Sequence, residues 1–308
     1  MTLRPASLAD LTRRLAEHHA AKRQVAAVDL VALAAVRDYT PEDMTVTAEG
    51  GLTLAALQAT LAARGQWLPV DPPQPERVTV RQLLAENLFG PRRCGFGTIR
   101  EHLIGLEAVL ADGRVIHSGG KVVKNVAGYD LLKLFVGARD SLGIVTAATF
   151  KLRPLPEHEL TLAAQFTTLS AACAAAAALL DAPITPVALD LHNLTPGAFT
   201  VVLTLAGTRA EVDWQRTRSG GFQLPSEPLV HELSFWASPQ PAHTDSVLPS
   251  QLPEALAALG SAPFLARAAN GIIHHRGRPQ PKPTIPLGLS RRLKDTFDPH
   301  HILPEAPL

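Results

Sequence analysis

The sequence lacks a surplus of charge of either sign. Its 29 Lys and Arg residues and 28 Asp and Glu residues give a formal net charge of +1 over 308 residues. Proteins that bind nucleic acid through its phosphate backbone carry a strong basic excess, so this balance argues against that class. It remains compatible with a local group of cations that serves one small anionic ligand.

Cysteine is scarce. The two cysteines, Cys94 and Cys173, lie in different segments and form neither a CxxC pair nor a zinc-ligand pattern. We expect two reduced thiols, as in a cytosolic protein. The adjacent histidine pairs at 18–19, 274–275 and 300–301 are poor chelators, because neighbouring side chains diverge on a helix or a strand. We therefore expect no metal site.

Long apolar runs are also missing. No window approaches about 18 uninterrupted apolar residues, so we expect no membrane-spanning helix. The charged N-terminal segment, residues 1–24, lacks the apolar core of a secretory signal. We expect a cytoplasmic protein, or one held at the inner face of the membrane by its partners. The signatures of P-loop nucleotide binding, G-x-S-x-G hydrolases and H-E-x-x-H metalloproteases are absent from the sequence.

Hydrophobic residues make up 46% of the chain, and 308 residues are enough for two domains with cores of their own. The apolar periodicity and the stop signals predict helices at 8–23, 53–64, 80–90, 208–221 and 289–298, and an Ala-rich helix that follows a strand and stops at Pro183. Asp112-Gly113 between two apolar runs predicts a β-hairpin, whereas PRRCGFG, residues 91–97, is expected to be a loop. Residues 224–253 receive no assignment.

The character of the chain changes after Pro154-Leu155-Pro156. The order strand, helix, strand, strand, helix that follows is typical of an α+β domain. We therefore predict one domain over residues 1–156 and a second over 157–308. The last helix of the chain is expected to return to the first domain.

Glycine recurs between residues 90 and 143, interleaved with Arg92, Arg93, Arg100, Lys121 and Lys124. Glycine allows a backbone to approach a ligand closely, and successive free N–H groups beside cations can hold a diphosphate. The same composition also fits a loop-rich sheet edge with solvated cations. Composition alone leaves both interpretations open.

Longer motifs point to a family. Residues 46–154 resemble the FAD-binding domain of the vanillyl-alcohol oxidase and p-cresol methylhydroxylase type. The matching segments occur in the family's order: VTAEGGLTLAALQATLAARGQWLPVDPP, GPRRCGFGTIREHLIGLEAVLADGRVI, GGKVVKNVAGYDLLKLFVGARDSLGIVTAATFKLRPLP and, at the C-terminus, LKDTFDPHHILPEAPL. The form K-N-V-A-G-Y-D-L is similar to that of FAD-binding subunits of bacterial glycolate oxidases.

The resemblance implies an α+β fold: a two-lobed FAD-binding domain of the p-cresol methylhydroxylase type with a shortened N-terminal lobe, followed by a C-terminal α+β domain that faces the substrate. It places the following residues around FAD: Pro72, Pro73, Thr79, Gly90, Arg92, Gly97, Thr98, Arg100, Gly143, Ile144 and Val145. No catalytic residue is assigned. Tyr129 and Asp130 are interpreted as structural, and His117 as a surface or half-buried residue rather than a proton acceptor.

The activity implied by the resemblance is that of an FAD-dependent oxidoreductase subunit. Such a subunit takes two electrons from a 2-hydroxy acid, with the flavin carrying the chemistry. The implied partners are a second flavoprotein subunit and an iron–sulfur subunit; since the chain has no cluster ligand set, the cluster belongs to a partner.

Four departures from the family pattern bear on the cofactor. An early glycine-rich loop is missing from residues 17–30, Arg81-Gln82 replace two glycines, Asp140 replaces another, and Glu305 replaces a fourth. Side chains in place of glycine can fill the space of a diphosphate. A flavin-free pseudo-subunit that acts as a scaffold is therefore the alternative function. A third interpretation is an enzyme of the same fold acting on another hydroxy acid or an aldonolactone.

Overall fold

The computed structural model describes residues 1–120, 131–225, 230–279 and 288–305. Tyr129 and Asp130, interpreted above as structural, lie outside the described residues. The chain divides into two units: residues 1–89, 98–155 and 284–308 form the first, and residues 90–97 and 156–283 form the second. Among the described residues, no helix has the length and apolar character needed to cross a membrane.

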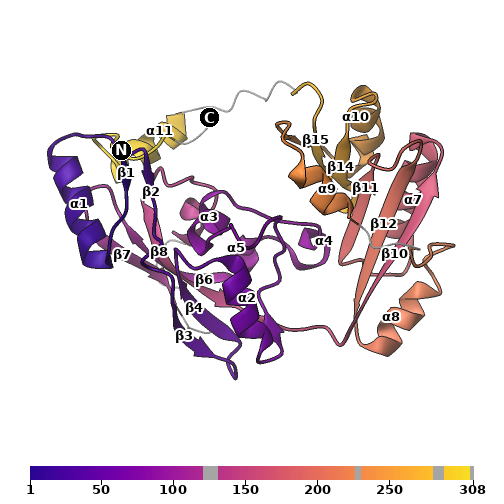
Figure 1. Ribbon diagram of the computed structural model, residues 1–308, viewed down its shortest axis with the longest axis horizontal. Coiled ribbons are helices and arrows are strands. Elements are labelled where there is room, and N and C mark those ends of the chain that lie inside the picture. The colour runs from indigo at the N-terminus through magenta and orange to yellow at the C-terminus, as the bar shows by residue number, and fades with distance from the viewer. Residues whose placement is uncertain (121–130, 226–229, 280–287, 306–308) are drawn as a thin grey trace. The chain divides into compact units, whose positions relative to one another are not determined.

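The first unit is built on a five-stranded sheet in the order β3-β4-β8-β6-β7 (Figure 1). All neighbouring strands are antiparallel: β3 (Val36–Thr40), β4 (Thr45–Glu49), β8 (Ile144–Lys151), β6 (Leu103–Val109) and β7 (Val115–Gly119). The predicted hairpin at Asp112-Gly113 is confirmed, since β6 and β7 pair on either side of it and Gly113 has a φ of +85°. A left-handed residue at this point is what glycine permits.

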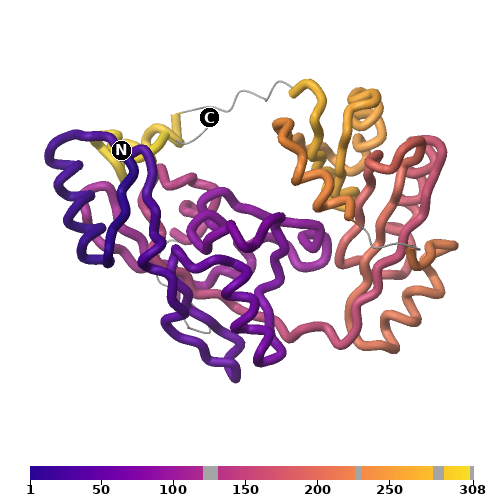
Figure 2. The backbone as a smooth tube through the Cα atoms, viewed as in Figure 1, coloured from indigo at the N-terminus to yellow at the C-terminus, as the bar shows by residue number. Residues whose placement is uncertain are grey.

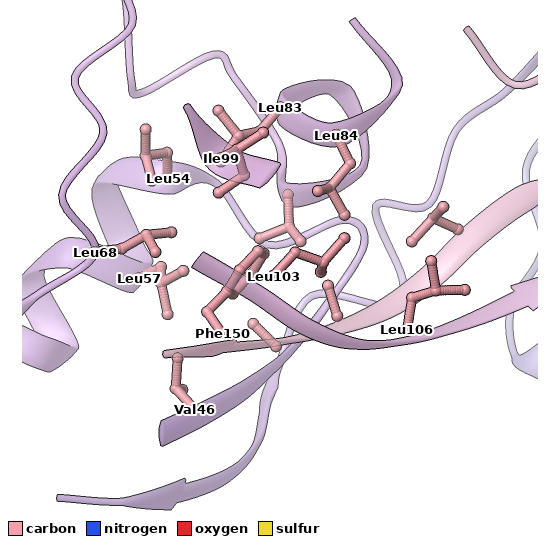
Figure 3. Close-up of a cluster of buried hydrophobic side chains, with 14 of the residues drawn as sticks. Val46, Leu54, Leu57, Leu68, Leu83, Leu84, Ile99, Leu103, Leu106 and Phe150 are labelled. Carbon is pink, nitrogen blue, oxygen red and sulfur yellow. The ribbon is translucent and has the colours of Figure 1, made fainter. Parts of the chain in front are cut away.

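Short helices cover one face of this sheet: α2 (Leu54–Ala62), α3 (Val80–Ala85), α5 (Ile99–His102) and α6 (Leu132–Phe135). Their apolar sides form a core with the sheet, as Figure 3 shows for Leu57, Leu83, Ile99 and Phe150. All four of these side chains are fully buried. Burial of such side chains is the main favourable term in folding.

The N-terminal lobe is small. The parallel strands β1 (Thr2–Leu3) and β2 (Ala27–Val28) flank helix α1 (Leu8–Ala20), which begins at the capping residue Ser7. A second core joins this lobe to Ile144 of the sheet and Ile302 of the C-terminal segment. Figure 2 shows this C-terminal segment beside the N-terminal one. The strands β5 (Gln66–Trp67) and β9 (Arg153–Pro154) pair separately.

Helix α11 (Gly288–Phe297) is anchored to the first unit by a buried ammonium group. Lys294 Nζ donates to the carbonyl oxygens of Ser141 (3.0 Å), Leu303 (3.0 Å) and Pro304 (3.1 Å), and to Asp298 Oδ2 (2.7 Å). Asp298 is fully buried and accepts the backbone N–H groups of residues 302 and 303. The motif K-x-x-F-D-P therefore fixes the end of the chain.

The second unit contains a six-stranded antiparallel sheet in the order β10-β12-β11-β14-β15-β13. These strands are β10 (His158–Phe166), β12 (Phe199–Gly207), β11 (Ala188–His192), β14 (Phe264–Arg267), β15 (Ile272–His275) and β13 (His243–Ser246). The helical elements of this unit are α4 (Arg93–Phe96), α7 (Leu169–Asp181), α8 (Arg209–Arg216), α9 (His231–Ala237), α10 (Leu252–Ala258), η1 (Pro249–Gln251) and η2 (Ala268–Asn270). Residues of α7 and α10 share one core with the sheet.

The expectation of a loop at residues 91–97 was wrong, because α4 forms there. The backbone N–H of Gly95 donates to Val187 O (3.1 Å), and a Cβ atom at Gly95 would lie 2.8 Å from Val187 Cα. Close packing of α4 against the residue before β11 thus stabilises a helical turn that the local sequence does not signal.

The Lys294–Asp298 pair leads to a stability prediction. D298A should lower the free energy of unfolding by about 3–5 kcal/mol, because it leaves a buried ammonium group without its counter-ion. Urea denaturation followed by circular dichroism measures this loss. Asp295, exposed on the same helix, provides the control: D295A should change stability by less than about 0.5 kcal/mol. Equal effects of the two variants would contradict the anchoring role.

Candidate functional site

The predicted position Thr79 caps helix α3 through a reciprocal pair of hydrogen bonds. Gln82 N donates to Thr79 Oγ1 (3.3 Å), and Thr79 N donates to Gln82 Oε1 (3.0 Å). The next two backbone N–H groups are also used, since Val80 N donates to Leu52 O (2.9 Å) and Arg81 N donates to the carbonyl of residue 50 (2.8 Å). The backbone N–H groups of residues 79–82 therefore all have partners within the chain.

The Gly50-Gly51 turn lies beside α3 and is closely covered. A Cβ atom at Gly51 would lie 1.9 Å from Leu30 O, and one at Gly50 would lie 2.6 Å from Val145 O. The N–H of Gly51 donates to Leu33 O (2.8 Å). Residues 30–33 occupy the space above the turn. Glycine is required at these positions because a side chain would collide with the backbone that covers them.

The side chains of Arg81 and Asp140 form an ion pair, and each is only 15% exposed. Burial raises the pKa of the Asp140 carboxyl group, Arg81 opposes this rise, and Glu86 adds to it. Asp140 has a φ of +63° and Arg139 a φ of +49°, so two consecutive residues adopt the left-handed conformation. Asp tolerates this conformation better than most residues.

The loop that carries Asp140 is docked on the C-terminal end of α3. Gly137 N donates to Leu84 O (2.9 Å), and Arg139 N donates to Ala85 O (2.8 Å). A polar cavity of about 390 Å³ lies next to the ion pair. Its lining residues are Arg81, Gln82, Ala85, Glu86, Arg139 and Asp140.

Other predicted positions in the first unit also have internal partners. Thr98 N donates to Glu101 Oε2 (2.7 Å), as does the Thr98 hydroxyl, and Arg100 Nη2 donates to the carbonyl of residue 133 (3.4 Å). A Cβ atom at Gly143 would lie 3.0 Å from Val109 O. Pro72, Ile144 and Val145 are buried, and Pro73 is half-buried.

Three of the predicted positions, Gly90, Arg92 and Gly97, belong to the second unit. Arg92 Nη2 donates to both carboxylate oxygens of Glu159, at 2.7 and 2.8 Å. Gly97 ends α4 with a φ of +79°, and its N–H donates to Arg93 O (3.1 Å). The predicted cofactor residues are thus divided between the two units.

The second unit contains a buried polar cluster that the sequence did not indicate, because its members come from β11, α9 and β14. Arg267 is 1% exposed, donates through Nη1 to Asp190 Oδ2 (2.9 Å) and also pairs with Glu232. Burial would raise the pKa of Asp190, but Arg267 and His231 hold it below its usual value. Asp190, His231 and Glu232 have a spacing compatible with a metal ion. Arg267 already supplies positive charge to both carboxylates.

Two histidines beside this cluster are held neutral. Burial and the nearby His231 lower the pKa of His192 to about 4, and its Nδ1 accepts the N–H of Leu194 (3.3 Å). Burial and Arg267 lower the pKa of His274 to about 3. His192 and His231 stack with their ring centroids 4.8 Å apart and line a cavity of about 720 Å³.

Comparison with known proteins finds a family model that matches part of the chain. Residues 12–119, which are 108 of the 308 residues, match the family model described as FAD binding domain. The fold agrees, since a solved structure of alkyldihydroxyacetonephosphate synthase superposes with a TM-score of 0.76 over 98% of this chain and 75% of that one, at 15% sequence identity. The predicted fold class, an FAD-binding domain of the p-cresol methylhydroxylase type, is confirmed.

Three curated relatives each match part of the chain. The chain is 39% identical over 149 residues to glycolate oxidase subunit GlcD of Bacillus subtilis, which is 48% of this chain and 32% of that protein. It is 38% identical over 126 residues to glycolate oxidase subunit GlcE of Escherichia coli, covering 41% and 36%. It is 41% identical over 119 residues to D-lactate dehydrogenase of Archaeoglobus fulgidus, covering 39% and 27%. The matched segments thus span about a third of these relatives.

The family model that matches residues 12–119 is described as an FAD binding domain, and FAD contains a diphosphate. A diphosphate needs free N–H donors and uncompensated cations. In the described part of the domain, the N–H groups of residues 79–82 have internal partners, and Arg81 is paired with Asp140. Leu30 fills the space above Gly51. As arranged, these residues do not fit a bound diphosphate, although the fold is that of the family.

The lowered pKa values of His192 and His274 give a pH prediction. Both histidines titrate near 6.5 when unfolded and near 4 and 3 in the fold. The unfolded chain therefore binds more protons than the folded chain in this pH range. The free energy of unfolding should keep its full value above pH 6.5 and should decrease as the pH falls toward 4. Each histidine should contribute a slope of up to about 1.4 kcal/mol per pH unit.

Denaturation at a series of pH values measures this slope. H192N keeps an acceptor for the Leu194 N–H and should remove about half of the slope. The matched control is H117N, since His117 is exposed on β7 and should leave the slope unchanged. A stability profile that is flat between pH 6.5 and 4 in the unmodified protein would disprove the assignment.

Proposed function

We propose that this chain is the FAD-binding-type subunit of a glycolate oxidase-type complex that oxidises 2-hydroxy acids. The observation that carries the proposal is the similarity of the chain, over 119–149 residues, to proteins named glycolate oxidase subunits and D-lactate dehydrogenase, at 38–41% identity. Glycolate and D-lactate share the 2-hydroxy acid group. Similarity to several proteins named for this one substrate class supports that class for the present chain.

The proposed partners are a second flavoprotein subunit and an iron–sulfur subunit. Support for a multi-subunit assembly comes from the two relatives that are themselves named as subunits. We propose that the assembly is cytoplasmic or bound to the inner face of the membrane through these partners. FAD bound to such a domain would supply two-electron chemistry. We assign no reaction step to a flavin on this chain, because the internally bonded residues 79–82 and the Arg81–Asp140 pair do not fit a bound diphosphate.

A second candidate function is a flavin-free subunit that acts as a scaffold for the catalytic subunits. The specific observation that favours it is the internal pairing of the backbone N–H groups of residues 79–82, together with the Arg81–Asp140 ion pair. Such a subunit would keep the fold of the FAD-binding domain, because the core of that domain is formed by the chain's own side chains.

Reconstitution tests the proposed function. The chain should co-purify with the two partner subunits from a common expression system, and omission of the chain should reduce glycolate- or D-lactate-dependent dye reduction by at least tenfold. Unchanged activity without the chain would refute a role in the complex. Dye reduction with an aldonolactone but with neither hydroxy acid would refute the substrate class.

The flavin content of the same preparation separates the two candidates. If this chain binds flavin, the complete complex should contain one FAD more than the partner subunits alone. If the chain is a scaffold, the FAD content should be the same in both preparations, while activity should still depend on the chain. Absorbance at the flavin band after acid release of the cofactor gives the number.

A further inference from the structure

Two departures from the family pattern meet in space. Residues 81 and 140 are 59 positions apart in the sequence, and at both of them the family resemblance leads one to expect glycine. The chain instead carries an arginine and an aspartate, whose side chains form an ion pair with only 15% of each exposed. Either charge alone would be poorly solvated at this degree of burial. The two substitutions therefore compensate each other.

The pair joins two segments at which the family resemblance implies glycines beside the diphosphate. Arg81 lies on α3, and its backbone N–H already donates to Gly50 O (2.8 Å). Asp140 lies on the loop that docks on α3 through the N–H groups of Gly137 and Arg139. The ion pair thus adds a third connection between α3 and this loop.

We propose that the Arg81–Asp140 ion pair is an internal lock that takes the place of the FAD diphosphate in this domain, and that a dinucleotide binds only when the lock is opened. The carboxylate of Asp140 repels a diphosphate and neutralises the cation that would attract it. Opening the pair frees the Arg81 guanidinium beside the 390 Å³ cavity. A guanidinium group binds phosphate oxygens through a fork of N–H donors.

The inference goes beyond the proposed function and depends only on the FAD-binding domain, not on the substrate or on the complex. Failure to oxidise 2-hydroxy acids would leave it intact, since it concerns the affinity of the isolated full-length chain for a dinucleotide. Conversely, equal FAD affinity of D140G and the unmodified chain would leave the reconstitution experiment unaffected. The two can therefore be judged separately.

The variant D140G tests the lock directly. Glycine adopts the φ of +63° found at this position without strain, and its introduction leaves Arg81 unpaired. Equilibrium dialysis should show that D140G binds FAD at least tenfold more tightly than the unmodified chain. ADP, which carries the diphosphate without the flavin, should compete with FAD for D140G, whereas riboflavin, which carries no phosphate, should not compete.

The matched control is D112G. Asp112 is also an acidic residue in a tight turn of the first unit, and it also pairs with an arginine, Arg114, at 2.6 Å. Its loss should leave FAD affinity within twofold of the unmodified chain. The charge-swapped variant R81D/D140R re-forms the ion pair with opposite polarity. Its FAD affinity should be as low as that of the unmodified chain.

Several results would overturn the proposal. One is an unmodified chain that purifies with one FAD per chain, and another is equal FAD affinity in D140G and the unmodified chain when circular dichroism shows both to be folded. If D140G does not fold, FAD binding by the unmodified chain still tests the proposal. Absence of saturable FAD binding and a melting temperature unchanged by FAD would support the lock, whereas tight FAD binding would refute it.

Discussion

The first unit depends on the buried ammonium group of Lys294. It joins helix α11, the carbonyl of Ser141 and the C-terminal segment at Leu303 in one network, with Asp298 as counter-ion. An uncompensated charge at this depth would cost several kcal/mol, so the four acceptors have to stay in place. Ser141 directly follows Asp140. The anchor of the C-terminal helix therefore also fixes the loop that pairs with Arg81.

From this loop, a continuous set of hydrogen bonds leads to the predicted cofactor region. Asp140 pairs with Arg81, the Arg81 N–H donates to Gly50 O, and Leu30 lies against the neighbouring glycine. The Arg81 N–H and Asp140 Oδ2 have partners within the chain, whereas Asp140 Oδ1 is buried without a hydrogen-bond partner. In buried regions, an unpaired polar group costs free energy comparable to a lost hydrogen bond. The backbone N–H groups of residues 79–82 avoid this cost through internal bonds, at and beside the position Thr79 that is predicted to contact FAD.

Features that depend on local sequence were predictable, and features that depend on distant contacts were not. The Asp112-Gly113 hairpin follows from turn chemistry, and the family's motifs indicated the fold. Helix α4 was missed because its stability comes from packing on Val187. Arg81 and Asp140 were recognised separately as departures, but their contact across 59 residues could not be inferred from either position. The residues predicted to surround FAD remain a prediction.

The fold alone does not decide the activity. A synthase at 15% identity shares this fold, and proteins named oxidase subunit and dehydrogenase match part of the chain. Function must therefore be argued from side chains that differ on a common backbone. Among the described residues, two groups of buried charges bear on this question: the Arg81–Asp140 pair in the first unit, and the cluster of Asp190, Arg267 and Glu232 in the second. In each group, a cation and a carboxylate are already paired within the chain. A phosphate that binds Arg81 would therefore have to replace Asp140 as the partner of the guanidinium group.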